Sequence, residues 1–520
     1  MKILDCTLRD GGYCNNWEFG KDNIKKIIGG LSDAGIDIIE CGFLTEKTVH
    51  TENISKFNTI EEISKILPIE RKIDFVCMVN YGEYNIKKIP ERSEQSVDGI
   101  RLAFHKKDIS GAMQIGEIIK KKGYDLYLQP MVSLNYTDEE FLSLIKWSNV
   151  LSPHAFYIVD SFGVMKQKEL IRLFYLVEHN LSRNIAIGFH SHNNMQLAYS
   201  NAQALLTNGS EHSLIIDSSV FGMGRGAGNL NTEIFVEYLN DYYKKNYDIK
   251  PLLNIIDEIL QIFYKRDYWG YSLPNYLSAK YNTHPNYASY LDTKKTLTME
   301  NMDEIFSMME DAKRVSYDED YIEKLYMRYM TSGEVQEIHL SELKEQIKDK
   351  TILIIAPGKS SMIEKEKITI AIKEGAMPIS VNFDYAESDT KYIFLSNLRR
   401  YRELPKDKLV KCIVTSNIPS LDAYVKTGYR ELLNSNTTVM DNAGLMLIKF
   451  MIKLGCGKIL LAGLDGYSYD ISSNYMSDRM QTDTTIEWIK KTNEGLMSVL
   501  KQYAKEVEIK FLTTPRYVKL

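Results

Sequence analysis

The stretch Gly188-Phe189-His190-Ser191-His192-Asn193-Asn194 decides what can be expected of this chain. It follows an apolar run and precedes residues typical of the start of a helix. On a β-strand, residues i and i+2 project from the same face, so His190 and His192 should point the same way, about 7 Å apart at ~3.3 Å per residue. Two imidazoles placed in this way can bind one divalent metal ion. An isolated His-x-His is more often a pair of hydrogen-bonded strand-end residues, so the rest of the chain must decide.

Length and composition indicate a multidomain cytoplasmic protein. A chain of 520 residues predicts two to four domains. A net charge of -5 and a pI near 6.1 do not favour nucleic-acid binding. No apolar run approaches the ~20 residues of a membrane span, and we expect no secretory signal, because the chain opens directly into a strand pattern. Six cysteines without a C-x-x-C pair are typical of reduced cytosolic thiols.

The first 250 residues predict an α/β fold, a (β/α)₈ TIM barrel. Short β-type runs alternate with amphipathic segments whose apolar residues recur at spacings of three and four. Eight strands are expected at residues 3–7, 36–43, 73–79, 99–104, 124–131, 155–160, 186–191 and 214–221. Eight strands alternating with eight helices favour a closed barrel over a doubly wound open sheet.

Polar residues gather where these predicted strands end, which is where (β/α)₈ barrels carry their chemistry. The eighth strand runs into a glycine-rich loop, residues 222–229, that lets backbone approach a ligand closely. The other strand ends carry Arg9, Asp10, Tyr13, Glu40, Arg101, Gln129, Ser161, His190 and His192.

Four motifs together resemble the DRE-TIM metallolyases over residues 1–245. They are Asp5-Cys6-Thr7-Leu8-Arg9-Asp10-Gly11-Gly12, Ile39-Glu40, His190-Ser191-His192-Asn193 and Gly222-Met223-Gly224-Arg225-Gly226-Ala227-Gly228-Asn229. This family includes 4-hydroxy-2-oxovalerate aldolase, hydroxymethylglutaryl-CoA lyase and isopropylmalate synthase. The glycine-rich loop resembles the aldolase branch, and its lack of a cysteine weighs against the hydroxymethylglutaryl-CoA lyase branch.

The resemblance implies a metal site and a 2-keto acid substrate. Asp10, His190 and His192 would bind a divalent metal, with Asn229 as a fourth ligand. Mn²⁺ is the first choice for this ligand set, and Mg²⁺ or Co²⁺ is an alternative. A metal chelated by keto and carboxylate oxygens stabilises an enolate as a Lewis acid. Arg9 would stabilise the enolate oxygen with fixed donors.

The catalytic base stays open at this point. In the hydroxy-oxovalerate aldolases a histidine follows the motif arginine by four residues, whereas here that position is Tyr13. Tyrosine, with an ordinary pKa near 10, is a poorer base at neutral pH. Tyr13 and Glu40 are the leading candidates, and a water at the metal is the third. The remaining polar rim residues that we expect to bind the keto acid and an aldehyde are Arg101, Ser161 and Arg225.

Two further segments follow the barrel. Residues 251–332 predict a helical extension, and residues 333–350 predict a linker. His284 lies in the extension. We favour a structural role for it, such as capping a helix, over an approach to the active site, because isolated motifs mislead.

Residues 351–520 predict a separate Rossmann-like α/β domain. A strand at 352–356 is followed by Pro357-Gly358-Lys359-Ser360-Ser361 and then a helix, which is how such domains hold phosphate. Gly358, Ser360 and Ser361 are the candidate nucleotide-binding residues, and a simple tight turn is the equally weighted alternative. The domain faintly resembles bacterial CMP-sialic-acid sialyltransferases and domains from surface-polysaccharide loci. Those transferases use a histidine base, but the last histidine here is His339, so binding a nucleotide or nucleotide sugar is expected rather than transfer.

The sequence thus predicts a cytoplasmic, metal-dependent aldolase or lyase of the pyruvate type, fused to a nucleotide-binding domain. It is expected to form a homo-oligomer and to act in surface-polysaccharide sugar metabolism. A Claisen-type enzyme that condenses an acyl-CoA with a 2-keto acid is one alternative. A non-catalytic nucleotide-sugar-binding protein is another, although Arg9, Asp10, His190 and His192 are all present.

Overall fold

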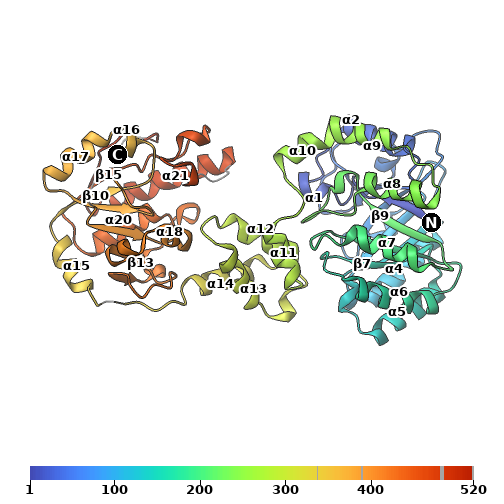
Figure 1. Cartoon of the computed structure of the whole chain (residues 1–520). Helices are drawn as coiled ribbons and strands as arrows, with labels where there is room; N and C mark the ends of the chain where they lie inside the picture. Colours follow the sequence, from blue (N-terminus) through green and yellow to red (C-terminus); the bar gives the residue numbers. More distant parts are fainter. Residues whose placement is uncertain (337, 388–389, 481–484, 518–520) are drawn as a thin grey trace. The chain divides into compact units, whose positions relative to one another are not determined.

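The chain forms two compact units in a computed structural model that describes residues 1–336, 338–387, 390–480 and 485–517. The barrel unit comprises Met1–Ser289 and Met309–Tyr317, and the C-terminal unit comprises Tyr290–Met308 and Asp318–Leu520 (Figure 1). The division falls inside the predicted helical extension, whose helices are therefore shared between the two units.

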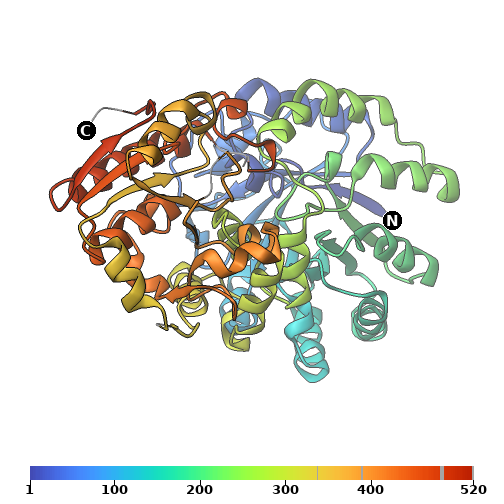
Figure 2. The same cartoon turned by 60° about the vertical axis from the view of Figure 1, so that its left-hand side comes forward.

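The barrel unit is built on eight parallel strands that close into a ring, as predicted (Figure 2). Neighbours pair in the order β1-β9-β8-β7-β6-β5-β4-β2, and pairing of β1 with β2 closes the ring. A two-residue strand, β3 (Lys56–Phe57), extends the edge beside β2. The barrel strands are β1 (Lys2–Asp5), β2 (Ile38–Leu44), β4 (Asp74–Asn80), β5 (Gly99–Phe104), β6 (Asp125–Pro130), β7 (Ala155–Asp160), β8 (Ala186–Ser191) and β9 (Leu214–Ser218).

Helices follow seven of the eight strands rather than all eight. Between β4 and β5 the described chain has only the 3₁₀ turn Ile86–Lys88. The connection carries Pro90, which removes a backbone donor, and a polar run after it. The helices outside the barrel are α2 (Lys21–Asp33), α3 (Ile60–Ser64), α4 (Ile109–Lys121), α5 (Asp138–Leu151), α6 (Gln167–Asn180), α7 (Ala198–Asn208) and α8 (Thr232–Tyr243), and a short α1 (Gly12–Asn15) follows β1.

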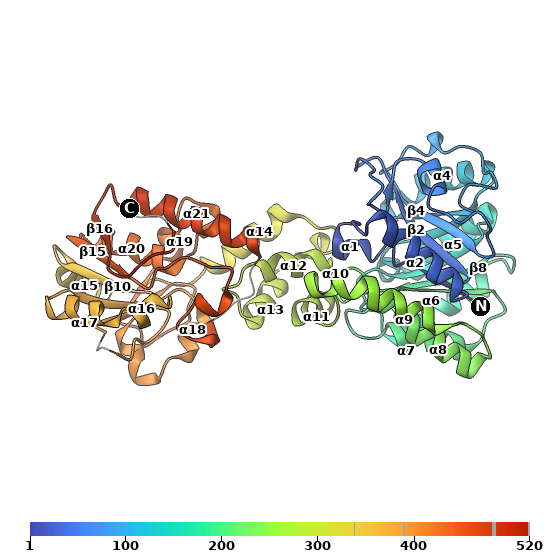
Figure 3. The same cartoon turned by 90° about the horizontal axis from the view of Figure 1, so that it is seen from above.

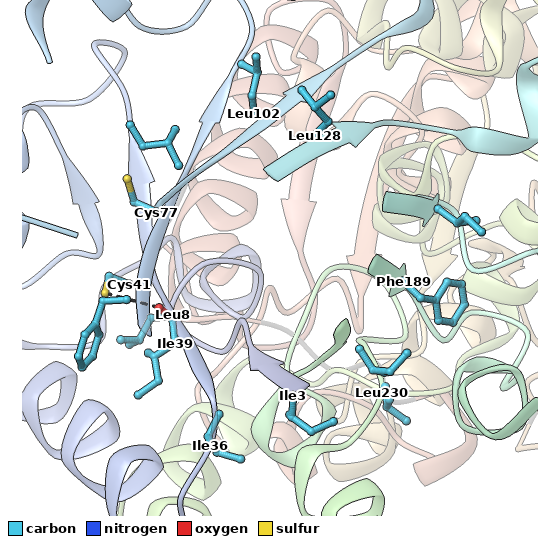
Figure 4. Close-up of a cluster of buried hydrophobic side chains, with 14 of the residues drawn as sticks. Ile3, Leu8, Ile36, Ile39, Cys41, Cys77, Leu102, Leu128, Phe189 and Leu230 are labelled. Atoms are coloured by element: carbon cyan, nitrogen blue, oxygen red, sulfur yellow. Dashed lines mark hydrogen bonds between the residues drawn. The ribbon is translucent and has the colours of Figure 1, made fainter. Parts of the chain in front are cut away.

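Alternation along the strands divides their residues between an outer apolar layer and the inside of the barrel. Apolar residues such as Ile3, Leu102 and Phe189 point outward and join the hydrophobic layer beneath the helices (Figure 4). The intervening residues point inward and include charged side chains. In β5, for example, Ile100, Leu102 and Phe104 lie in the outer layer, while Arg101 is buried inside the barrel. The two-residue period of a strand therefore supplies both layers.

The segment after the barrel is helical. The barrel unit contains α9 (Ile249–Ile255), α10 (Gln261–Arg266) and α11 (Leu273–Lys280), and α12 (Pro285–Thr293) crosses into the C-terminal unit. The C-terminal unit then contains α13 (Met299–Ser307) and α14 (Glu319–Met330).

The predicted linker contains a packed helix. Residues 340–347 form α15 (Leu340–Ile347), with Leu343 and Ile347 buried. Their spacing of four residues puts both on one face of the helix. Residue 337 of the predicted linker lies outside the described residues. The polar composition of this segment and its glycine led to the prediction of a linker. The burial of only two apolar residues, Leu343 and Ile347, packs a short helix there instead.

The C-terminal unit has one sheet of seven parallel strands in the order β14-β13-β12-β11-β10-β15-β16 (Figure 3). The order reverses direction between β10 and β15. Besides the strand at 352–356, the sequence pattern predicts strands at 378–381, 392–395, 409–414 and 458–462, and all five are present. The pattern does not predict the short β14 or the edge strand β16. The strands are β10 (Thr351–Ile355), β11 (Met377–Val381), β12 (Tyr392–Leu395), β13 (Cys412–Thr415), β14 (Val425–Thr427), β15 (Lys458–Ala462) and β16 (Glu508–Phe511).

Helices of the C-terminal unit include α16 (Ser360–Ile363), α17 (Lys365–Lys373), α18 (Leu398–Glu403), α19 (Tyr429–Leu432), α20 (Ala443–Lys453) and α21 (Ile486–Tyr503). The apolar pattern at residues 443–454 also predicts a helix, and the structure has α20 there. This helix begins where Asn442 accepts a hydrogen bond from the backbone N–H of Leu445. Across the described residues of both units, no helix is long and apolar enough to cross a bilayer.

Candidate active site

Three predicted metal ligands lie together at the carboxyl end of the barrel strands. His190 is the second-last residue of β8, and His192 directly follows the end of that strand. Asp10 lies in the loop after β1. Each offers one ligand atom, and these atoms all lie within 4.8 Å of one another. The two imidazole rings are 5.2 Å apart between centroids, and all three side chains are buried. The i,i+2 spacing and the strand-end aspartate therefore meet as the sequence predicted.

His190 is oriented by a residue that the sequence analysis did not single out. Its Nδ1 lies 2.9 Å from Oδ2 of Asp217, on the neighbouring strand β9. Burial alone would raise the pKa of Asp217, but the charges of Arg101 and His190 hold it below its ordinary value. The carboxylate therefore accepts a hydrogen bond from the Nδ1–H of His190, which leaves Nε2 free to bind a metal. A lone acidic residue in the apolar run Leu214-Ile215-Ile216-Asp217 was the available signal.

His192, Asp10 and Asn229 complete the cluster. Burial lowers the pKa of His192 to about 3, and its Nδ1, 3.7 Å from Asp10 Oδ2, has no hydrogen-bond partner. Burial would raise the pKa of Asp10, but Arg9 and the imidazoles hold it well below its usual range. Asn229 donates from Nδ2 to Asp10 Oδ2 at 2.7 Å, and its buried Oδ1 has no partner. A Cβ at Gly224 would lie 2.3 Å from Asn229 Nδ2, so the loop needs glycine there.

Arg9 is held in place with one donor left over. Its Nε donates to Glu40 Oε2 at 2.8 Å, and its Nη1 donates to Asp10 Oδ1 at 2.5 Å. Its Nη2 is buried and has no hydrogen-bond partner. Glu40, fully buried, also accepts from Arg101 Nη1 at 2.7 Å. Glu40 therefore binds two guanidinium groups, a position suited to fixing Arg9.

Arg101, predicted to bind substrate, lies inside the barrel and is completely buried. Its guanidinium pairs with Glu40 and Asp217 and lies 4.9 Å from the ring of Tyr157. These contacts place it among the residues that support Arg9 and His190, and it does not line the pocket described below. The sequence could locate it on the inner face but not at which depth.

The residues present fit a divalent cation. Inside the barrel, the carboxylates of Asp10, Glu40 and Asp217 outnumber the guanidinium groups of Arg9 and Arg101 by one negative charge. A cation beside Asp10 would offset that excess. The unpartnered buried atoms, Oδ1 of Asn229 and Nδ1 of His192, are the oxygen and nitrogen types that divalent metals bind.

A pocket of about 280 Å³ at the barrel rim is lined by three other predicted site residues, Tyr13, Ser161 and Arg225, whereas Asp10, His190 and His192 are not among its lining residues. Two hydrogen bonds hold Ser161 in place. Its Oγ accepts from the backbone N–H of Val132 at 2.9 Å, and its carbonyl oxygen accepts from Arg225 Nη2 at 3.1 Å. The Arg225 guanidinium lies 5.2 Å from the ring of Tyr13. Loss of hydration raises the pKa of Tyr13 above its ordinary value of 10. The same pocket also contains His284.

The predicted nucleotide-binding turn lies in the C-terminal unit, between β10 and α16. Its donors are engaged within the protein. The backbone N–H of Gly358 donates to Gly463 O at 2.9 Å, and that of Ser360 donates to Asp465 Oδ2 at 2.8 Å. The Ser360 hydroxyl also donates to Asp465, and the Ser361 hydroxyl donates to Gly358 O at 2.7 Å. A carboxylate of the chain thus lies where a phosphate was predicted, and nucleotide binding at this turn stays a prediction.

Comparisons with known proteins place the barrel in a family. The chain matches the HMGL-like family over residues 1–259. It is 27% identical over 242 residues to a 4-hydroxy-2-oxovalerate aldolase of Geobacillus genomosp. 3, covering 46% of this chain and 70% of the relative. It is 24% identical over 238 residues to an oxaloacetate decarboxylase of Mycobacterium tuberculosis strain H37Rv, covering 46% and 69%.

A solved structure agrees with the fold. A pyruvate carboxylase of Rhizobium etli is similar with a TM-score of 0.50 at 14% identity, covering 63% of this chain and 36% of that chain. The N-terminal domain of a protein described as an aldolase from Bacteroides vulgatus is 28% identical, covers 56% of this chain and 97% of that chain, and has a TM-score of 0.49. The match over residues 1–259 and the cluster of Asp10, His190 and His192 lead to one conclusion: the barrel of this chain is an HMGL-like domain of the DRE-TIM metallolyase type.

Proposed function

We propose that the barrel unit is a divalent-metal-dependent enzyme that makes or breaks a carbon–carbon bond next to the keto group of a 2-keto acid. Pyruvate is the proposed enolate donor. The observation that carries the proposal is the unpartnered Nη2 of Arg9, a buried charged donor beside the cluster of Asp10, His190 and His192. A fixed donor next to a metal site matches the oxygen of an enolate, where negative charge develops.

In this proposal Asp10, His190 and His192 hold the metal, with Oδ1 of Asn229 as a fourth ligand. The mixed nitrogen and oxygen donors support Mn²⁺ as the first choice, with Mg²⁺ or Co²⁺ as alternatives. A bound cation would supply Lewis acidity at the keto oxygen of the substrate.

Arg9 would donate from Nη2 to the enolate oxygen while Glu40 and Asp10 hold its other nitrogens. Because the donor is already oriented, little reorganisation is needed as the charge develops. Glu40, a candidate base from the sequence, is fully buried and accepts from both Arg9 and Arg101, so its contacts support an orienting role.

Tyr13 lines the pocket in which we place the aldehyde. Its raised pKa keeps the phenol protonated at neutral pH, which supports donation of a hydrogen bond to the aldehyde oxygen rather than proton abstraction. With Glu40 paired and Tyr13 protonated, water is the remaining candidate for the proton acceptor.

The proposed setting is the cytoplasm, since all six cysteines of the chain are free thiols. A role in surface-polysaccharide sugar metabolism is the proposed pathway context. It rests only on the resemblance of the C-terminal sequence.

The test is a substrate screen on the full chain loaded with Mn²⁺. Pyruvate is offered with acetaldehyde, propanal and a set of sugar aldehydes, and new hydroxy-keto acids are detected by mass spectrometry. Parallel reactions contain oxaloacetate alone, or acetyl-CoA with a 2-keto acid. Metal-dependent aldol product that is lost in Asp10→Asn supports the proposal. Acetyl-CoA consumption without aldol product would instead favour the condensing-enzyme alternative.

A further inference from the structure

We propose that Arg225 and His284 form a two-donor site for a carboxylate of the substrate, in which the neutral imidazole of His284 is a hydrogen-bond donor. The inference rests on the proposed function and deepens it, because it adds to the active site a residue from outside the eight strands. It also assigns a chemical class, a carboxylate, to the group bound at this end of the pocket.

His284 reaches the pocket from the segment between α11 and α12. It lines the same pocket as Tyr13, Ser161 and Arg225. Its Nε2 lies 3.4 Å from Nη1 of Arg225. The sequence left two roles open for this residue, helix capping or an approach to the active site. In the structure His284 both accepts a hydrogen bond at the start of α12 and lines the pocket.

The capping contact favours one of the two neutral forms of the His284 ring. The backbone N–H of Asn286, in the first turn of α12, donates to Nδ1 of His284 at 3.2 Å. The backbone N–H of Asn286 and the Arg225 guanidinium can both only donate, and a neutral imidazole has one lone pair to offer them. The contact at Nδ1 is the shorter, 3.2 Å against 3.4 Å at Nε2, which favours the lone pair on Nδ1 and the proton on Nε2. Burial, followed by the charge of Arg225, lowers the pKa of His284 to about 3, so the ring is neutral near pH 7.

Two donors therefore approach one another without an acceptor between them. The Arg225 guanidinium carries only donors, and the Nε2–H of His284 is also a donor. Arg225 uses Nη2 on the carbonyl of Ser161, while its buried Nε has no partner. Among the described residues, no carboxylate is within ion-pair distance of Arg225. Two donors that lie 3.4 Å apart can both bind one carboxylate, and hydrogen bonds to a charged acceptor are the strong ones.

The His284 ring is held firmly enough to position a ligand. Its centroid lies 6.0 Å from those of Phe162 and Tyr317, which come from the barrel rim and from the returning segment 309–317. Its backbone N–H donates to Arg314 O at 2.8 Å. A donor fixed by neighbours on several segments is pre-organised for binding.

The carboxylate can come from two sources, the 2-keto acid itself or an acidic group on the aldehyde. The test uses the Mn²⁺-loaded full chain and calorimetry with two probes. The first probe is pyruvate. The second is propionate, added to protein saturated with pyruvate, as a stand-in for an acidic aldehyde. The variants are His284→Gln, which keeps a side-chain donor, and His284→Phe, which removes it. His179→Phe, an exposed position on α6, is the matched control.

We expect His284→Phe to weaken one probe about tenfold, His284→Gln to weaken it less than threefold, and His179→Phe to leave it unchanged. Weaker pyruvate binding identifies the keto acid as the source, and weaker propionate binding identifies an acidic aldehyde. Arg225→Gln should weaken the same probe, which provides a second variant if His284→Phe does not fold.

The inference is overturned if neither probe binds the wild type, if neither binds more weakly to His284→Phe and Arg225→Gln, or if His284→Gln is as impaired as His284→Phe. The last result would indicate proton transfer or packing instead of donation. Failure of the proposed function is seen separately, as a wild-type chain that binds a probe but catalyses no metal-dependent exchange of the pyruvate methyl protons.

Discussion

Nδ1 of His190 lies 2.9 Å from Oδ2 of Asp217, and this contact fixes the imidazole with Nε2 available to a metal. Asp217 in turn pairs with Arg101, and Arg101 pairs with Glu40, which holds Arg9. His190, the proposed metal ligand, and Arg9, the proposed enolate-binding arginine, are therefore connected through one buried set of ion pairs. Their geometry depends on residues that no substrate would touch.

Asp217→Asn should lower the affinity for Mn²⁺ by about 10–100-fold, because a neutral amide orients and polarises the His190 ring less well than a carboxylate. Electron paramagnetic resonance titration of Mn²⁺ measures the effect. Asp257→Asn, an exposed change of the same type, is the control. Equal affinity in the wild type and Asp217→Asn would remove Asp217 from the metal site.

Arg9→Lys should abolish turnover and leave the metal content intact. The guanidinium can donate to Glu40, Asp10 and a substrate at once, whereas an ammonium group offers a point charge without the planar fork. Metal analysis and the aldol screen are run on the same preparation. A Lys variant with near wild-type rates would exclude Arg9 from catalysis.

The stability of the barrel should depend on the titration of Asp5. Burial raises the pKa of this carboxyl from 3.8 to about 6. Between these values the folded chain keeps a proton that the unfolded chain has lost, so stability falls as pH rises through the interval, and the loss is complete above about pH 6. Asp5→Asn can still accept from the backbone N–H of Thr7 and can donate to Thr232 Oγ1, whose hydroxyl lies 2.8 Å from Ser218 Oγ.

The Asn variant should therefore gain stability relative to the wild type, by about 1–3 kcal/mol, when the pH is raised from 4 to 7. Urea unfolding at several pH values, followed by tryptophan fluorescence, gives the comparison. Parallel pH profiles for the two proteins would show that Asp5 does not titrate in this range.

Asp465 should compete with phosphate at the turn after β10, because its carboxylate already accepts the hydrogen bond of the Ser360 N–H. Calorimetry of the full chain with CMP is expected to show binding that is at least about tenfold tighter in Asp465→Asn than in the wild type. Identical CMP binding in both proteins would place any nucleotide site elsewhere in the C-terminal unit. No heat with either protein would return this turn to a structural role.

The sequence predicted most of the barrel because each strand is a short apolar run, most of them followed by a helical pattern, and its residues alternate between an outer apolar layer and an inner face that is partly apolar and partly charged. The His190 and His192 spacing also carried over directly, since a strand places i and i+2 on one face. The sequence around each polar residue does not show how deep inside the barrel its side chain lies. Arg101 looked like a rim residue, and its pairing with Glu40 and Asp217 depends on three strands that are far apart in sequence.

Other features were missed for similar reasons. The approach of His284 to Arg225 joins residues 59 positions apart, from a segment with no periodic pattern of its own. The linker prediction failed to see α15 because only Leu343 and Ile347 mark its buried face. Asp465 lies more than a hundred residues from Ser360, so the sequence could show the glycine-serine turn but not the carboxylate that fills it.

The central claim, a metal site that stabilises the enolate of a 2-keto acid, is tested most directly by hydrogen exchange in pyruvate. The full chain is loaded with Mn²⁺ and incubated with pyruvate in D₂O without any aldehyde. After removal of the metal, the pyruvate methyl signal is followed by NMR. We predict loss of this signal with the wild type, and no loss with the metal-stripped chain or with Asp10→Asn. A methyl signal that persists with Mn²⁺-loaded wild type, or that decays equally without metal, would contradict the account.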